Sequence, residues 1–137
     1  MFEVKATDLA GRIGRLRTKN GTIETPALLP VIHPIHQQVP VRELSNIGFK
    51  AVMTNAYITM KHYGDTAAEI DIHRIIDFDG VVMTDSGGYQ VLEYGDIAVD
   101  PVNMAKFEES ISTDIAITLD TPTTKDASRT HAQKTVR

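Results

Sequence analysis

Residues 80–90 read Gly-Val-Val-Met-Thr-Asp-Ser-Gly-Gly-Tyr-Gln, a short apolar run that gives way at once to polar residues and glycines. A run of this length, bounded by turn-forming residues, is typical of a strand that is covered on both faces, as in a parallel sheet. Similar runs occupy residues 27–32, 51–54 and 115–119. We therefore predict four buried parallel strands, the run at 80–84 being one of them.

Helical patterns lie between and after these runs, at residues 41–47, 66–76, 100–111 and 124–137. Gly48 is a typical stop for the first helix, and Asp100-Pro101 is a typical start for the third. In the second helix, Ile72, Ile75 and Ile76 should face inward. Strands that alternate with helices predict βαβ units in a parallel sheet.

An antiparallel hairpin is predicted ahead of this pattern. Residues 12–18 and 22–25 flank Lys19-Asn20-Gly21, and Asn-Gly between such segments is a strong hairpin signal. Four parallel strands are half of a (β/α)8 TIM barrel, and 137 residues are near half of its roughly 250. We therefore expect the N-terminal half of such a barrel: a hairpin over about residues 1–26 and a half-barrel over about 27–137. A self-sufficient open α/β sheet is the alternative on pattern alone.

Composition limits the chemistry that the chain can perform. It is 42% hydrophobic and 23% charged, which predicts a packed core, and it has no apolar run of membrane-spanning length and no signal peptide, so we expect a cytoplasmic protein. The absence of cysteine excludes disulfides, thiolate catalysis and cysteine-bound zinc within these residues. A net charge of -4 gives no broad basic surface for nucleic acid.

Polar side chains follow three of the predicted strands, where ligands bind in parallel α/β folds. They include Asn55, Asp85 and Asp120. Carboxylates that only accept hydrogen bonds suit a ligand with a row of N–H donors, such as the N1–H and N2–H2 edge of guanine. An amine, a sugar or a metal held by Asp85 and Asp120 would fit these residues equally well.

The residues after the third strand suit a flat ligand. Gly87 and Gly88 allow the backbone to approach it closely and offer free N–H groups, and Tyr89 could stack on its plane. His33 and His36 are poor candidates for metal ligands, since Pro34 between them disfavours a regular helix and no acidic residue is close in sequence. We expect no metal or cofactor in this chain.

The stretch Thr84-Asp85-Ser86-Gly87-Gly88-Tyr89-Gln90 is similar to the D-S-G-G-aromatic-Q signature of the tRNA-guanine transglycosylases. Residues 26–31, 54–57 and 119–123 match the same family in order. The resemblance covers essentially the whole chain, and it is closest to the archaeal, archaeosine-forming branch.

The resemblance implies roles for individual residues. Asp85 would contact the base and handle its proton, Asp120 would bind the donor edge of the base, and Tyr89 would stack on it. Ser86 would lie in the substrate pocket. The supporting residues would be Asn55 and Gln90, which can hold Asp85, together with Gly87 and Gly88.

The resemblance also implies substrates and a partner. The substrates would be tRNA, with a guanine at a D-arm position of the 15 type, and 7-cyano-7-deazaguanine, exchanged through a covalent glycosyl-enzyme. No segment here matches the family's nucleophile or its Cys and His zinc motif. We therefore expect a split enzyme or a fragment, in which a complementary C-terminal subunit supplies both within a hetero-oligomer. A queuosine-type exchange and a non-catalytic base- or tRNA-binding scaffold are the alternatives.

Overall fold

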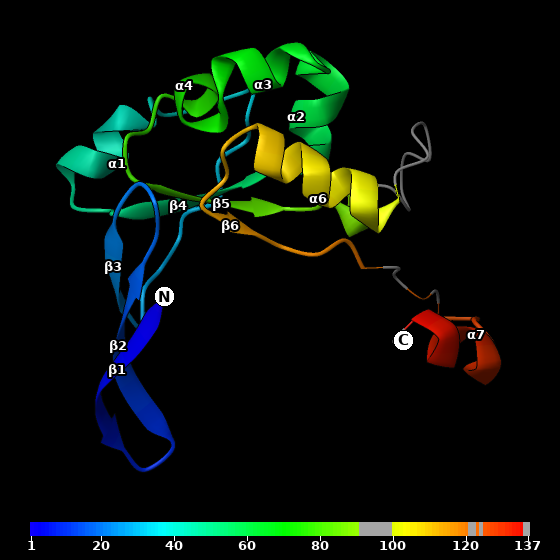
Figure 1. Cartoon of the computed structure of the whole chain (residues 1–137), viewed down its shortest axis with the longest axis horizontal. Coiled ribbons are helices and arrows are strands. Elements are labelled where there is room, and N and C mark those ends of the chain that lie inside the picture. Colours follow the sequence, from blue (N-terminus) through cyan, green and yellow to red (C-terminus); the bar gives the residue numbers. More distant parts are fainter. Residues whose placement is uncertain (91–99, 121–122, 124, 136–137) are drawn as a thin grey trace.

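The structure, a computed structural model, describes residues 1–90, 100–120, 123 and 125–135. The described residues form two three-stranded sheets (Figure 1). Strands β1 (Phe2–Asp8), β2 (Gly11–Arg17) and β3 (Thr22–Thr25) form an antiparallel sheet. Strands β4 (Ala51–Asn55), β5 (Val81–Asp85) and β6 (Ile115–Ala116) form a parallel one. The predicted α/β class, with an antiparallel hairpin before parallel strands, is confirmed, whereas closure into a barrel stays a prediction.

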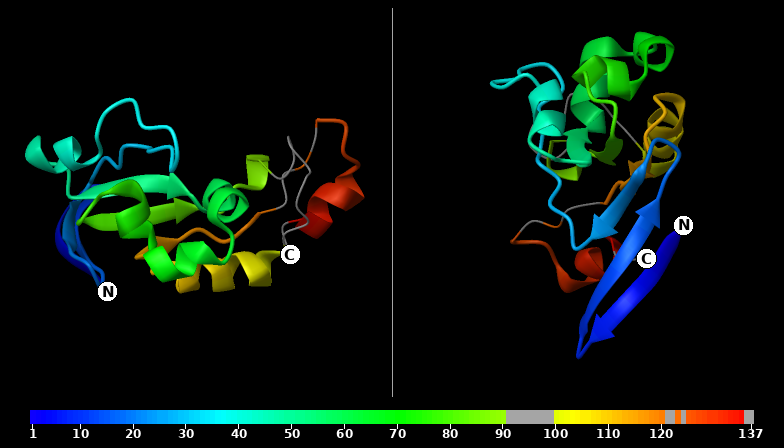
Figure 2. Two further views of the ribbon diagram at one scale, coloured as in Figure 1. Left: turned by 90° about the horizontal axis from the view of Figure 1, so that it is seen from above. Right: turned by 90° about the vertical axis from the view of Figure 1, so that its left-hand side faces the viewer.

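Five helices of the described residues pack on one face of the parallel sheet (Figure 1). They are α1 (Arg42–Asn46), α2 (Ala56–Tyr63), α3 (Thr66–Ile70), α4 (Ile72–Ile76) and α6 (Pro101–Ser110), of which α2, α3 and α4 connect β4 to β5 and α6 connects β5 to β6. A further helix, α7 (Arg129–Thr135), follows β6. Val52 and Val82 meet Ile72, Ile76 and Ile111 in the main buried cluster. Because side chains alternate along a strand, the neighbours of Val82 on β5 face the opposite side of the sheet. Figure 2 shows α7 set apart from this layer.

The predicted strand at residues 27–32 is wrong. Only one parallel bridge, between Val31 and Met53, forms there, with Ile32 N–H donating to the Met53 carbonyl at 2.7 Å and Met53 N–H donating to the Pro30 carbonyl at 2.8 Å. Pro26 and Pro30 have no N–H, so this segment cannot sustain a ladder. Its apolar composition alone did not reveal this.

Three other boundaries differ from the prediction. The last strand ends at Ala116 rather than residue 119: Ile117 N–H still reaches the Thr84 carbonyl, but the next partner would lie beyond the end of β5. Residues 66–76 form two helices because Asp71, at φ 71°, leaves the helical conformation and accepts a hydrogen bond from Arg74 N–H as the cap of α4. The final helix begins at Arg129, after Ser128, whose hydroxyl accepts from His131 N–H; residues 124, 136 and 137 of the predicted span lie outside the described residues.

The strand β1 and the helix α2 were not predicted. Other expectations are confirmed: Ile72 and Ile76 are buried with Ile75 partly buried against them, and Asp100 caps α6 by accepting from the N–H groups of Val102 and Asn103.

The turn between β2 and β3 is fastened to the amino-terminal end of the parallel sheet. Asp114, whose side chain is fully buried, accepts hydrogen bonds from the backbone and side-chain N–H groups of Asn20 at 3.0 and 3.3 Å. Its other oxygen accepts from Val82 N–H at 3.0 Å and lies 3.4 Å from His73 Nε2. The hairpin therefore sits at the end of the sheet opposite to the carboxyl ends of its strands. Among the helices that the structure describes, none is long and apolar enough to cross a membrane.

Candidate functional site

Asn55 organises the carboxyl ends of β4 and β5, where it lies directly opposite Asp85 in the parallel register. Its side-chain oxygen accepts from Ile58 N–H at 2.9 Å and so caps α2. That bond fixes the orientation of the amide, and its Nδ2 group consequently faces the site. Nδ2 donates to Asp85 Oδ2 and to Gln90 Oε1, each at 3.2 Å. One buried side chain thus links the start of a helix to two predicted site residues.

The turn after β5 holds the second oxygen of Asp85. Gly87 N–H donates to Asp85 Oδ1 at 3.3 Å, and Gly87 has a φ of 82°, which disfavours other residues. A Cβ atom at Gly87 would also collide with the Cβ of Tyr57. Glycine is therefore required here both by the backbone conformation and by the packing of α2.

Asn55, Asp85 and Gln90 lie on one cavity of about 360 Å³. Ile32, Met53 and Ile58 contribute apolar surface to the same cavity. A volume of this size, mostly apolar with a few convergent polar groups, is typical of a site for a small molecule. The polar groups offer hydrogen-bond acceptors, the carboxylate of Asp85 above all, to a ligand that carries N–H donors.

The remaining predicted residues occupy different positions. Asp120 is exposed, and it packs so closely on Gly88 that a Cβ atom there would collide with Asp120 Oδ1. Tyr89 is 65% exposed, whereas Ser86 is buried and its hydroxyl has no hydrogen-bond partner among the described residues. Ser86, Tyr89 and Asp120 are not among the residues that line the cavity with Asp85. Their roles toward a base stay predictions.

Glu108, which the sequence analysis did not single out, is buried beneath this site. It lies on α6 with 1% of its surface exposed, and Thr84 Oγ1 donates to its Oε1 at 2.7 Å. Burial raises the pKa of Glu108, and the negative charge of Asp85 adds to this rise, while hydrogen bonds from Thr84 and the backbone of Ile117 oppose it. Burial thus favours the neutral form of Glu108, whose partner Thr84 directly precedes Asp85 on β5.

This raised pKa predicts a pH-dependent stability. The folded state holds the proton of Glu108 more tightly than the unfolded state, whose pKa is near the ordinary 4.5. The stabilisation that protonated Glu108 gives the folded state is therefore complete below the unfolded-state pKa. It is lost as pH rises through the folded-state pKa. Glu108→Gln keeps an acceptor for Thr84 and should remove this decline in the free energy of unfolding, measured by urea denaturation between about pH 4 and pH 8. Glu109→Gln, on the exposed side of α6, is the matched control, and an unchanged decline in Glu108→Gln would contradict the assignment.

The sequence analysis missed both the helix α2 and the buried carboxylate of Glu108, although each had left a signal in the sequence. Asn55 before a segment that ends at Gly64, with Lys61 and His62 in its last turn, has the start and stop signals of a helix. Glu108 lies four residues after Met104 and three before Ile111, so it falls on the buried face of α6. A charged residue at such a position indicates a buried partner.

The fold and the cavity together define a class of protein: a parallel α/β protein with a cavity suited to a small polar ligand at the carboxyl ends of its strands. A model of the queuine tRNA-ribosyltransferase family matches residues 8–137 of the chain. The chain belongs to this family, the tRNA-guanine transglycosylases, as its D-S-G-G-Y-Q stretch predicted.

Curated relatives carry the same family name. The chain is 48% identical over all of its length to a tRNA-guanine(15) transglycosylase of Aeropyrum pernix, covering 27% of that protein. It is 43% identical over 98% of its length to the enzyme of that name from Sulfolobus acidocaldarius, covering 26% of it, and 46% identical over 96% to that from Methanothermobacter thermautotrophicus, covering 20%. The chain thus spans about a quarter of the length of these relatives.

Proposed function

We propose that this chain is the base-recognition part of a tRNA-guanine transglycosylase, which exchanges guanine at position 15 of tRNA for 7-cyano-7-deazaguanine in archaeosine formation. The family membership and the names of the archaeal relatives support the reaction and the position. The single observation that carries the residue assignment is the amide of Asn55, which holds Asp85 and Gln90 on the wall of a small cavity.

In this proposal each site residue acts on the base. Asp85, with both oxygens held by N–H donors, orients the base and takes or returns its proton. Asp120 accepts from the N1–H and N2–H2 edge, and Tyr89 stacks on the ring. The nucleophile lies outside this chain: its carboxylate bonds to the ribose C1′, the glycosidic bond breaks, and guanine leaves with the electron pair and gains a proton. The incoming base then loses a proton and displaces the carboxylate.

The zinc ion that the family implies does not fit the residues of this chain. The sequence contains no cysteine, and no three His, Asp or Glu side chains among the described residues are grouped so that they could hold a metal. We propose that a complementary C-terminal part, in a hetero-oligomer with this chain, holds the zinc and supplies the nucleophile. No step assigned to this chain involves the metal.

A base-exchange assay tests this proposal. The chain by itself, and the chain combined with its complementary part (the assembled enzyme), are each given tRNA and labelled guanine or 7-cyano-7-deazaguanine. We expect the assembled enzyme to incorporate either base at position 15 and the chain by itself to incorporate neither, because the nucleophile is missing. Robust exchange by the chain alone would refute the division of roles, and incorporation of another deazaguanine at another position would indicate the queuosine-type reaction instead.

A further inference from the structure

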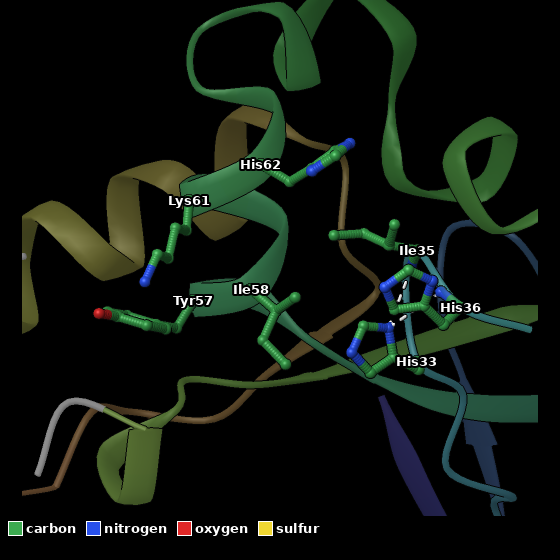
Figure 3. Close-up of a pocket in the computed structure, with 7 residues that line it drawn as sticks. All are labelled: His33, Ile35, His36, Tyr57, Ile58, Lys61 and His62. Atoms are coloured by element: carbon green, nitrogen blue, oxygen red, sulfur yellow. Dashed lines mark hydrogen bonds between the residues drawn. The ribbon is translucent and has the colours of Figure 1, made fainter. Parts of the chain in front are cut away.

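A second cavity, whose lining is drawn in Figure 3, has a volume of about 430 Å³ and adjoins the cavity that contains Asp85. The two cavities share His33 and Ile58, so His33 stands at their junction. The second cavity lies between the segment at residues 33–36 and helix α2, and its other lining residues are Ile35, His36, Tyr57, Lys61 and His62. Nothing in the proposed exchange of the base uses it.

The lining of this cavity suits an anion. Four of its seven side chains carry basic nitrogen, and none of these seven described residues is acidic. This differs from the chain as a whole, whose net charge is -4. Tyr57, also in the lining, is 1% exposed, and its hydroxyl has no hydrogen-bond partner within the described structure. A buried hydroxyl without a partner is costly unless a ligand or water satisfies it.

The local backbone fixes the proton of His33. Its Nδ1 accepts hydrogen bonds from Ile35 N–H at 3.2 Å and from His36 N–H at 3.1 Å, so this nitrogen carries no proton. The neutral ring must then carry its proton on Nε2. Figure 3 shows Nδ1 turned toward the backbone of residues 35 and 36, with the other ring nitrogen directed away from it. His33 therefore presents a fixed N–H donor at the junction of the two cavities.

We propose that the second cavity binds a phosphate of the RNA backbone next to the exchanged nucleotide, with His33 Nε2–H as the hydrogen-bond donor. The inference rests on the proposed function, since a nucleoside whose base lies against Asp85 brings its flanking phosphates within one ribose of that base. Phosphate oxygens accept from such donors, and the seven lining residues include no carboxylate that would repel the anion. His33 is thus a positioning residue for the RNA and takes no part in the exchange chemistry.

The test separates the donor from the turn that supports it. His33→Asn keeps an oxygen able to accept from the N–H groups of residues 35 and 36, but it loses the Nε2–H group. Binding of the assembled enzyme is measured to three RNAs: the native substrate and two in which the phosphate on one or the other side of the exchanged guanosine is an uncharged methylphosphonate. Affinity for free guanine is measured alongside, and His131→Asn, on the exposed surface of α7, is the matched control.

His33→Asn should weaken binding of the native RNA roughly tenfold, and it should weaken binding of free guanine much less, because guanine carries no phosphate. His131→Asn should leave both affinities unchanged. With one of the two methylphosphonate RNAs, the loss caused by His33→Asn should disappear, because the contact is already absent. An equal loss with all three RNAs, or no loss with the native one, would overturn the proposal. Such a result would leave the base-recognition role intact if exchange still depends on Asp85, whereas indifference of exchange to Asp85 would refute the proposed function itself.

Discussion

The assembled enzyme carrying Asp85→Asn should exchange bases at least about 100-fold more slowly than the unaltered enzyme, the scale of losing a general acid–base group. The substitution keeps the size of the side chain but removes its ability to take a proton. It also disturbs the site, because both oxygens of Asp85 accept hydrogen bonds, one from Asn55 and one from Gly87. An amide can satisfy only one of these donors and must direct its own N–H2 group at the other. Single-turnover incorporation of labelled base measures the effect.

Asp79→Asn is the matched control for this variant, since Asp79 is an exposed aspartate that precedes the opposite end of the same strand. It should leave turnover unchanged. The covalent tRNA adduct gives a second readout: on a denaturing gel with each part separately labelled, tRNA should be attached to the complementary part and never to this chain. Full turnover in Asp85→Asn, or an adduct on Asp85, would contradict the role assigned to it.

The parallel strands were predictable because burial on both faces leaves a visible apolar run, as at residues 51–54 and 80–84. The same reasoning failed at residues 27–32, where the composition is equally apolar but Pro26 and Pro30 remove the donors that a ladder requires. It also failed at Asp71, where one aspartate divides a helical pattern by adopting a positive φ and capping the next helix. A hydrophobic pattern indicates which segments are buried, whereas the backbone N–H and C=O groups that are available decide which segments pair as strands.

The site residues that end parallel strands were predictable from the sequence. The residues that are placed by tertiary contacts were less predictable. Asn55 and Asp85 end neighbouring strands, and parallel register alone puts them opposite one another. The position of Glu108 behind Thr84 depends on how α6 packs against the sheet, which no local pattern states. The tautomer of His33 likewise depends on two backbone N–H groups in an irregular turn. Contacts of this kind follow only from the three-dimensional arrangement of the chain.

The second large effect that we expect is a loss of guanine affinity when Asp120, or Gly88 beside it, is substituted. In the assembled enzyme, Asp120→Ala should weaken guanine binding by about 1.5–3 kcal/mol, the scale of hydrogen bonds to a charged group. Gly88 gives an independent route to the same loss. A Cβ atom there would collide with the Asp120 carboxylate and stand 3.2 Å from the Asp120 carbonyl oxygen, so Gly88→Ala should displace an intact Asp120.

Because both changes act through the same carboxylate, their effects on guanine affinity should not add. Calorimetry of guanine binding to Asp120→Ala, Gly88→Ala and the double variant provides the cycle, with Asp79→Ala as the control for loss of an exposed carboxylate. We expect the double variant to bind guanine no more weakly than Asp120→Ala by itself. Additive losses would mean that Gly88 affects the base by another route. Guanine affinity that is unchanged in Asp120→Ala would remove Asp120 from the site and leave Asp85 as the carboxylate assigned to the base.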